Sequence, residues 1–442
     1  MKKHLLTIAI AGLAFCVCQN TFAQSASTQN VGPSGYNRCG SMEYLEWQKQ
    51  QDPGLKARMD KIESDMQTWM KNSPPTTNAI VTIPIVVHML YFNATQSVSA
   101  TRVQQQVDVL NKDYHKLNTD WNKTPSAFLP LVADCEVQFC LASKDPSGAA
   151  TTGIVYKQLA SNISWASDNK VKSTAQGGDD PWDATKYLNL WVCNLGSGLL
   201  GYAQFPGGST STDGVVVLYS SLPGGSAPYN LGRTATHEIG HWLNLYHIWG
   251  DDGAGSGGAC SGTATSQCNG SDQVTDTPNQ CGATYGTIAA GTVKTDICAT
   301  AAPGYMWMNY MDYTDDACMY MFSAGQKTRI TACLNSSRTG LLTSAASKCT
   351  ATGIAENILS ENVSLYPNPS TGDVFMSVNI PSISSADVTV YNAVGGAVLQ
   401  KRVSISSGDD VRLDMNNRPD GMYLIRLKTT EGTITKKIII NR

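Results

Sequence analysis

The sequence of 442 residues predicts two folded units in series, a large α/β domain followed by a smaller all-β sandwich. Between residues 79 and 350, short runs of β-branched residues alternate with segments of helical spacing. Residues 355–442 show only the alternation typical of half-buried strands, and they contain no cysteine and no histidine. The composition, 42% hydrophobic and 15% charged, is globular. A net charge of −3 gives no reason to expect nucleic acid as a partner.

The large domain is expected to begin with a buried strand. Val81–Val87 is an apolar run bounded by turn residues, and apolar residues recur at helical spacing from Val103 to Leu117. The stripe of apolar residues in Asn230–Leu243 predicts a second helix. Further strands are expected at Val137–Ala142, Tyr187–Asn194 and Gly214–Tyr219. Residues 250–304 are rich in Gly, Ser, Thr and Cys, which indicates a long irregular segment held by disulfides.

The C-terminal unit alternates between apolar and polar residues in six short runs, separated by turns such as Asn392–Gly396. Strands are expected at Val363–Tyr366, Asp373–Val378, Asp387–Tyr391, Val398–Val403, Val411–Met415 and Met422–Lys428. This pattern predicts the β-sandwich of residues 355–442.

The first 23 residues have the pattern of a secretory signal. Lys2 and Lys3 precede the apolar run Leu5–Cys18, and Thr21–Ala23 provides a small-x-small cleavage site. The alternative is a lipoprotein signal, but a bulky phenylalanine directly before Cys16 disfavours it. No later segment has the apolar length of a transmembrane helix, so we expect an exported protein without an integral membrane segment in its mature form.

Residues 24–78 are polar and end in a Pro-Pro breaker, which is typical of a removable pro-segment. Glu43–Met70, within this segment, has helical spacing. The number of cysteines in the chain is informative as well. Of 13 cysteines, Cys16 and Cys18 leave with the signal, and 13 − 2 = 11 is odd. In an oxidising compartment, the other ten could form up to five disulfides, and one thiol would have a different role.

The residue pattern that carries chemistry is H-E-I-G-H-W-L-N-L-Y-H at residues 237–247. On a helix, His237 and His241 lie on one face and can bind one metal ion through two imidazoles. Glu238 is placed to accept a proton from a metal-bound water. A downstream glutamate cannot be the third ligand, because none occurs between Glu238 and Glu356. His247 is therefore the expected third ligand, and the metal is expected to be zinc.

Asn244 stands where the pattern H-E-x-x-H-x-x-G-x-x-H has glycine. The helix must end there in a sharp turn, which usually requires a positive φ, and asparagine tolerates that conformation best after glycine. The alternative is that these histidines only fill a core or a surface. The third histidine, the export signal and a downstream methionine motif together argue against it.

Four segments resemble, in the right order, the pappalysin family of metzincin metallopeptidases, especially its smaller microbial members. Besides residues 237–247, they are L-L-G-Y-A-Q-F-P-G at 199–207, D-Q-V-T-D-T-P at 272–278 and N-Y-M-D-Y at 309–313. The resemblance implies a zinc endopeptidase with a metzincin-like fold, in which a twisted mixed sheet and two helices lie above the cleft and an irregular subdomain lies below it. It covers about Ile80 to Asn335.

The resemblance also implies roles for single residues. Met311 would be an apolar floor beneath the imidazoles, and Tyr313 would stabilise the oxyanion. Asp316 would lie at the base of the S1′ pocket and favour arginine or lysine directly after the scissile bond. The simpler alternatives are a core methionine, a loop tyrosine and a solvated aspartate.

A calcium site and two disulfides follow from the same resemblance. The calcium ligands would be oxygen atoms of Asp272, Val274, Asp276 and Thr277, although Asp/Thr-rich turns are also common without metal. The disulfides would join Cys268 to Cys298 and Cys281 to Cys318.

Asn37-Arg38-Cys39-Gly40 resembles the cysteine switch of the family. A thiolate at Cys39 would bind the zinc and keep the protein latent until the pro-segment is removed. This role would account for the odd number of cysteines, and a structural disulfide is the alternative.

The C-terminal unit resembles the sorting domain of type IX secretion, through Leu365–Gly372 and the closing stretch from Gly421 to Ile440. A substrate-binding sandwich is the alternative. The resemblance implies the type IX machinery as a partner and export across the outer membrane to the medium or the cell surface. Altogether we expect a secreted, initially latent zinc endopeptidase acting on proteins and peptides. The alternative is a secreted adhesin on a catalytically dead protease fold, which predicts a missing ligand or base, and none is missing.

Overall fold

The computed structural model describes residues 35–72, 80–251, 268–344, 348–349, 362–378, 385–405, 410–429 and 432–442. The expected secretory signal, the Pro-Pro breaker and Cys260 lie outside these residues.

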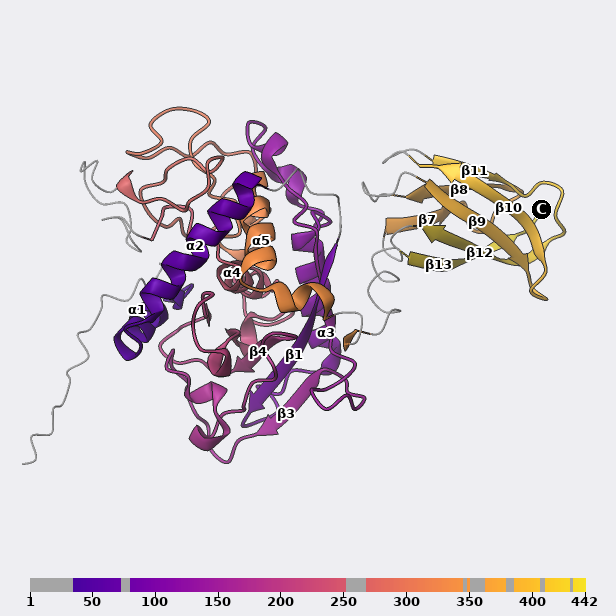
Figure 1. The fold of residues 1–442 in the computed structure, drawn as a ribbon. Coiled ribbons are helices and arrows are strands. Elements are labelled where there is room, and N and C mark those ends of the chain that lie inside the picture. The colour runs from indigo at the N-terminus through magenta and orange to yellow at the C-terminus, as the bar shows by residue number, and fades with distance from the viewer. Residues whose placement is uncertain are drawn as a thin grey trace, which may run out of the picture.

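A six-stranded mixed sheet lies at the centre of the large α/β domain (Figure 1). Its strands are β1 (Val81–Tyr91), β2 (Val137–Leu141), β3 (Ile154–Gln158), β4 (Leu188–Cys193), β5 (Gly201–Ala203) and β6 (Val215–Leu218). The order is β2-β1-β4-β6-β5, with β3 paired to the second half of β1. Only β5 runs antiparallel to its neighbour. Strands β4 and β6 are fully buried, which explains why their sequences are apolar except for Asn189 in β4.

The four strands that the sequence predicted are therefore confirmed as β1, β2, β4 and β6. Strands β3 and β5 were not predicted. Strand β3 has exposed positions and ends in Lys157 and Gln158, and β5 is only three residues long. Neither is long and apolar enough to be recognised by periodicity.

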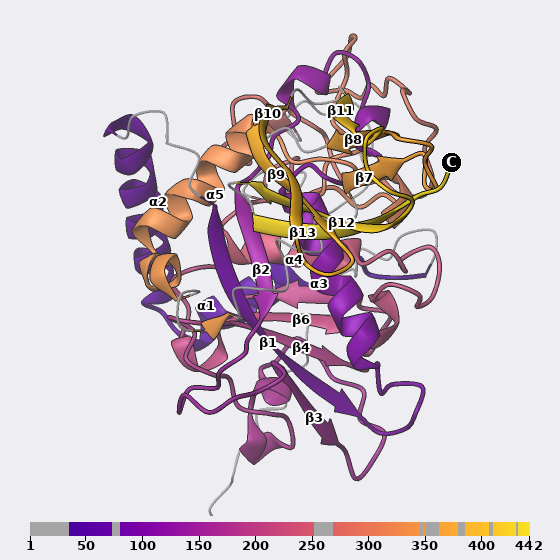
Figure 2. The ribbon, with the colours of Figure 1, turned by 90° about the vertical axis from the view of Figure 1, so that its right-hand side faces the viewer.

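Two helices pack on the sheet, α3 (Ala100–Tyr114) and α4 (Arg233–Trp242), and they contact each other (Figure 2). Ser99 caps α3 by accepting a hydrogen bond from the Arg102 backbone N–H. Residues 268–322, which follow α4 in the chain, contain no α-helix and no extended strand, as expected for the irregular subdomain. Helix α5 (Ala324–Ser336) follows and begins with a capping box formed by Ser323 and Gln326.

The N-terminal segment forms two helices, α1 (Ser41–Gln51) and α2 (Leu55–Asn72), instead of one. Pro53 and Gly54 lie at the break, because neither residue continues a helix well. Both views show α2 beside α5 (Figures 1 and 2). The segment packs on the large domain, and Tyr44, Leu45 and Met66 are buried in this contact.

The C-terminal strands form a sandwich of two antiparallel sheets, as predicted. One sheet has the order β10-β9-β12-β13 and the other β11-β8-β7. The strands are β7 (Val363–Tyr366), β8 (Asp373–Val378), β9 (Ser385–Asn392), β10 (Ala397–Ser404), β11 (Asp410–Asp414), β12 (Gly421–Thr429) and β13 (Gly432–Ile440). Their inward residues form one apolar core between the sheets. Among the described residues, no helix combines the length and apolar character needed to cross a bilayer.

The cysteines pair only partly as expected. The disulfide Cys268–Cys298 is present, and a further one joins Cys140 to Cys349. The pairing of Cys281 with Cys318 was wrong, because Cys318 is a free thiol while Cys281 is disulfide-bonded. The Cys318 sulfur instead accepts a hydrogen bond from the Ile288 backbone N–H at 3.2 Å.

The odd number of cysteines does not by itself single out Cys39. Four other described cysteines are free and buried, namely Cys135, Cys193, Cys318 and Cys333. A buried thiol can serve as a small apolar side chain, so an odd count does not single out one of them.

Candidate metal centre

The centre is built on α4, which is buried along its whole length. Gly232 precedes the helix with φ of 85°, a conformation in which glycine is unstrained. The carboxylate of Asp316 accepts hydrogen bonds from the Leu231 and Arg233 backbone N–H groups at 2.9 and 3.3 Å. A negative charge is favourable at the N-terminal end of a helix, so Asp316 stabilises the start of α4 and fixes its position.

The three predicted histidines converge. His241 Nε2 lies 3.1 Å from His237 Nε2 and 3.1 Å from His247 Nε2. The Cys39 sulfur joins them, and the four ligand atoms all lie within 4.8 Å of one another. All four residues are buried.

The opposite nitrogen of each imidazole determines its tautomer. The Nδ1 atoms of His237 and His241 face the carbonyl oxygens of Tyr310 and Leu245 at 2.7 and 2.8 Å. His247 Nδ1 faces the Asp251 carboxylate at 2.7 Å. Because each Nδ1 faces an acceptor, it must carry the proton, and each Nε2 then presents a lone pair.

This donor set fits zinc. The lone pair of His241 Nε2 lies 3.1 Å from those of His237 and His247, and such lone pairs repel one another unless a cation lies between them. Two nitrogens bound to a tetrahedral zinc at their usual bond length lie about 3.3 Å apart, close to this spacing. Burial, followed by the charges of the neighbouring imidazoles, holds the pKa of His237 and His241 well below the usual value, so both rings are neutral as metal binding requires.

Glu238 lies directly beside this cluster and is fully buried. Its Oε2 accepts a hydrogen bond from the Ser41 hydroxyl at 2.7 Å and a weaker one from the Cys39 thiol at 3.4 Å. Burial raises the pKa of Glu238 to about 7, a value suited to accepting and returning a proton near neutrality. Gly201 on β5 allows this approach, since a Cβ there would lie 2.9 Å from Glu238 Cγ.

The turn after α4 has the predicted conformation. Asn244 has φ of 68°, and the Leu245 N–H bonds back to the Gly240 carbonyl at 2.9 Å. Met311 lies beneath the helix, fully buried, where a Cβ on Gly240 would meet its sulfur at 2.4 Å. Glycine at this position therefore permits the close packing of Met311 under the metal-binding residues.

Tyr313 is placed next to the imidazoles, and only 3% of it is exposed. Its ring centroid lies 5.6 Å from that of His237 and 4.9 Å from that of His247. It also packs edge-on against Trp249 at 4.9 Å. Burial raises its pKa well above the usual value, so the phenol is neutral and can donate a hydrogen bond.

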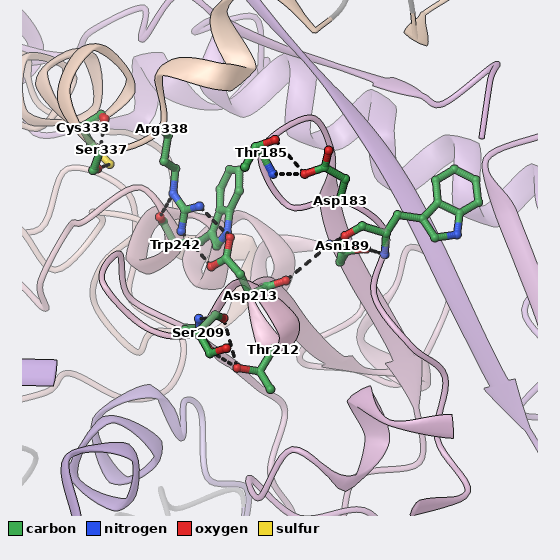
Figure 3. A network of polar contacts seen from close by, with 12 residues as sticks. Asp183, Thr185, Asn189, Ser209, Thr212, Asp213, Trp242, Cys333, Ser337 and Arg338 are labelled. Carbon is green, nitrogen blue, oxygen red and sulfur yellow. Dashed lines mark hydrogen bonds and ion pairs between the residues drawn. The ribbon is translucent and has the colours of Figure 1, made fainter. Parts of the chain in front are cut away.

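A polar network fixes the end of α4 (Figure 3). Arg338 donates to both carboxylate oxygens of Asp213 at 2.7 and 3.1 Å and to the Trp242 carbonyl at 2.8 Å. The Trp242 indole N–H also donates to Asp213, at 3.2 Å. Asp213 precedes β6, so the network ties the end of the active-site helix to the sheet.

The N-terminal segment enters the site through Arg38. One guanidinium nitrogen donates to Asp316 at 2.9 Å and the other to the Thr234 hydroxyl at 2.9 Å. The guanidinium also lies 4.7 Å from the centroid of the Tyr229 ring. The side chains of Arg38 and Asp316 are 1% and 0% exposed. Asp316 is thus the anion of a buried pocket that holds an arginine, and not a solvated aspartate.

The oxygen atoms of the expected calcium ligands converge only in part. The Thr277 hydroxyl lies 2.6 Å from the Asp272 carboxylate and 3.1 Å from the Val274 carbonyl oxygen. Asp276 instead accepts hydrogen bonds from Ser323 and from the Gly325 backbone N–H at the start of α5.

Comparison with known proteins agrees with this geometry. Residues 172–335 match the peptidase family described as pregnancy-associated plasma protein-A, the pappalysins, and residues 364–441 match the secretion system C-terminal sorting domain. An extracellular metalloprotease of Podospora anserina is 31% identical over 340 residues, which cover 74% of this chain and 96% of that protein. The chain belongs to the pappalysin family.

Two solved structures from Tannerella forsythia are similar over about two thirds of this chain. A promirolysin mutant is 38% identical with a TM-score of 0.63, and the match covers 71% of this chain and 99% of that one. Mature mirolysin in complex with a cleaved peptide is 41% identical with a TM-score of 0.56, covering 62% of this chain and 98% of that one. The chain is accordingly a secreted zinc metallopeptidase, directed to the medium or the cell surface by its C-terminal sorting domain.

Several residues of the site were not found from the sequence. Asp251 was passed over because it lies beyond the metal-binding motif, in a stretch of Gly and Asp with no periodicity. Ser41 and Arg38 act through contacts with residues about 200 to 280 positions away, as in the pair Arg38–Asp316. The Arg38-Cys39 dipeptide, a cation beside the expected metal-binding thiol, was the available signal for Arg38.

Proposed function

We propose that the chain is a latent zymogen of a zinc endopeptidase that cleaves before arginine or lysine, and that residues 24–78 are its pro-segment. One observation carries this proposal: consecutive residues of the N-terminal segment occupy two functional positions. Arg38 fills the pocket of Asp316, and Cys39 completes the ligand set of the three histidines.

Latency would result from three contacts. Cys39 as a thiolate would take the fourth zinc position, where a catalytic site otherwise holds water. The Ser41 hydroxyl binds the Glu238 carboxylate, which the reaction requires free. Backbone hydrogen bonds from Gly40 N–H to the Gly201 carbonyl and from Leu200 N–H to the Asn37 carbonyl hold the segment along β5. The match to promirolysin covers more of this chain than the match to mature mirolysin, which also favours a pro-form.

The preference for a basic residue follows from the pocket that Arg38 occupies. Because Asp316 is fully buried, a substrate side chain that enters without a positive charge would leave a desolvated carboxylate unpaired. An arginine would also find the Thr234 hydroxyl and the Tyr229 ring. We assign this pocket to the residue directly after the scissile bond.

In the activated enzyme, bound zinc would polarise the scissile carbonyl and acidify its water. Glu238 would accept the proton of that water and donate it to the leaving amine. Tyr313 would donate its phenolic proton in a hydrogen bond to the developing oxyanion, while Met311 supports the imidazoles from below. We also propose a structural calcium ion at Asp272, Val274 and Thr277, where the oxygen atoms converge, with Asp276 oriented toward α5.

Cleavage mapping tests the proposal. The full-length zymogen is activated by limited trypsin digestion, trypsin is inhibited, and the cut sites in a denatured protein mixture are mapped by mass spectrometry. We expect cuts before Arg and Lys that disappear with a zinc chelator and in the Glu238→Ala variant. Zinc-dependent cuts before other residues would remove the assignment of Asp316. A folded, zinc-loaded and processed protein without cleavage would instead favour the catalytically dead adhesin.

A further inference from the structure

Arg329 on α5 makes the second charged contact between the N-terminal segment and the catalytic domain. Its two terminal nitrogens donate to the two carboxylate oxygens of Glu63 on α2, at 2.8 and 2.9 Å. This is the parallel, two-point pairing in which arginine binds carboxylates most specifically. The Arg329 side chain is 1% exposed, and it also donates to the Asn244 carbonyl at 3.2 Å.

An aromatic path connects Arg329 to the metal ligands. The Phe205 ring lies 5.2 Å from the His241 ring and stacks on Tyr246 at 5.4 Å with an interplanar angle of 25°. The Arg329 guanidinium lies 5.6 Å from the centroid of the Tyr246 ring. We call Phe205, Tyr246 and Arg329 the aromatic path. These side chains form an unbroken series of contacts from His241, an expected zinc ligand, to the buried guanidinium of Arg329.

The N-terminal segment covers most of this path, and Tyr246 stays partly exposed. Leu45 and Leu55 form one apolar cluster with Phe205, and Met59 and Tyr246 pack against that cluster. Glu63 then covers the guanidinium. Proteolytic removal of the segment would expose two aromatic rings and leave Arg329 without its carboxylate partner. A buried cation that loses its partner is costly, so the released surface would favour a new anion.

The direction of the chain tells which part of a substrate would lie there. Arg38, which precedes Cys39, enters the Asp316 pocket, whereas the residues after Cys39 continue into α1 and α2. Asp316 accepts hydrogen bonds from the Leu231 and Arg233 N–H groups at the start of α4. Arg329 donates to the Asn244 carbonyl just beyond the end of α4, so the aromatic path and Asp316 lie at opposite ends of the helix that carries His237 and His241. If Asp316 takes the residue after the scissile bond, which rests on the proposed function, the aromatic path faces the residues before that bond.

We propose that the aromatic path is a second specificity site of the activated enzyme. It binds the part of the substrate on the amino side of the scissile bond, with apolar residues on Phe205 and Tyr246 and an acidic side chain on Arg329. In the zymogen, Glu63 occupies the position that the substrate carboxylate takes after activation. The Asn244 carbonyl and the Tyr246 ring hold the guanidinium in place, so the site is preorganised for a carboxylate.

Peptide kinetics test this site. Peptides with arginine directly after the scissile bond carry Glu, Gln or Lys at each of the second to sixth positions before it. Only the cut before that arginine is quantified, by mass spectrometry, because an added Lys is itself a possible cleavage site. For the trypsin-activated wild type, we expect at one or two of these positions that kcat/KM is about fivefold to tenfold higher for Glu than for Gln, and lowest for Lys. The difference should lie mainly in KM and should shrink at high salt.

A charge-swapped zymogen separates specificity from folding. Glu63→Arg combined with Arg329→Glu keeps opposite charges facing each other, so the N-terminal segment can still dock. After activation, this variant should prefer Lys over Glu at the same positions. Lys327→Gln is the matched control on the same helix, because Lys327 pairs with Glu136 of the catalytic domain at 2.9 Å and not with the N-terminal segment. The control should keep the wild-type ratio.

Two results would overturn the site: equal kcat/KM for Glu and Gln at every position in the wild type, or an unchanged preference in the swapped variant. If the swapped zymogen does not fold, Arg329→Gln replaces it, and the Glu-to-Gln ratio should fall to about one. Failure of the proposed function looks different, since the Gln peptides would then not be cleaved in a zinc-dependent way.

Discussion

Among the described residues, two ion pairs link the N-terminal segment to the catalytic domain, and they differ in polarity and in exposure. In the first, the segment supplies the cation, Arg38, and both side chains are almost fully buried, at 1% and 0% exposed. In the second, the segment supplies the anion, Glu63, which is 26% exposed, while Arg329 is 1% exposed. The Asp316 pair is thus desolvated on both sides, and the Arg329 pair is open to solvent on one side. The first pair should dominate both latency and specificity, because an unpaired charge costs most where water is excluded.

The largest effect is expected for Asp316→Asn. Two matched peptides, one with Arg and one with Leu directly after the scissile bond, are compared in the activated enzyme. The ratio of their kcat/KM values, Arg over Leu, should fall about 100-fold, because loss of a buried charge partner costs several kcal/mol. Asp315→Asn is the matched control, because Asp315 pairs with the Thr287 hydroxyl and makes no contact with Arg38 among the hydrogen bonds of this loop. An unchanged ratio in Asp316→Asn would mean that another group selects the basic residue.

The next effect is expected for Arg38→Gln in the zymogen. Without the guanidinium, Asp316 remains buried and unpaired under the N-terminal segment, so the docked form is destabilised. The peptidase activity of the uncleaved protein should rise about 30-fold. It is measured on protein in which the N-terminal segment cannot be cleaved off. If the variant stays as latent as the wild type, Cys39 alone is sufficient and the pair has no part in latency.

A smaller effect is expected for Glu63→Gln, because this carboxylate is partly solvated. Activity of the uncleaved zymogen should rise by about fivefold or less. Asp65→Asn serves as the control, since Asp65 pairs with Lys61 on the exposed face of α2, and its loss should change nothing measurable. An effect of Glu63→Gln larger than that of Arg38→Gln would reverse the order assigned to the two pairs.

The pH dependence tests the pair of Glu63 and Arg329. Burial alone would raise the pKa of Glu63, but the hydrogen bonds and the charge of Arg329 outweigh it and hold the pKa below the usual 4.5. A carboxyl whose pKa is lowered in the docked form contributes stability that is complete above its undocked pKa and is lost as the pH falls through the docked value. Hydrogen exchange of α2 should therefore accelerate below pH 4.5 in the wild type, after correction for intrinsic rates. In Glu63→Gln, protection should be lower and should not change in this window.

Much of the catalytic site could be predicted from sequence because it depends on local geometry. The spacing of His237 and His241 on one helix face, and the left-handed turn at Asn244, follow from backbone rules alone. Most strands of the three sheets were recognisable where they are long and either apolar or regularly alternating, but β13 (Gly432–Ile440) was not among the expected strands.

The contacts between distant segments could not be predicted in this way. Arg329 lies on a helix with no unusual pattern, and its pairing with Glu63 joins residues 266 positions apart. The same limitation produced the wrong pairing of Cys281 with Cys318, since thiols pair by distance in the folded chain. Helix α1 was likewise joined to α2 in the expectation, although Pro53 marked the break.

X-ray absorption at the zinc edge tests most directly whether the N-terminal segment blocks the metal. The zinc-loaded zymogen and the activated enzyme would be measured as a pair, with Cys39→Ala as the control. We expect one sulfur at about 2.3 Å and three nitrogens at about 2.0 Å in the zymogen, and replacement of the sulfur by oxygen after activation. A zymogen without a sulfur ligand, or an activated enzyme that keeps one, would contradict the assignment of Cys39 as the group that holds the protein latent.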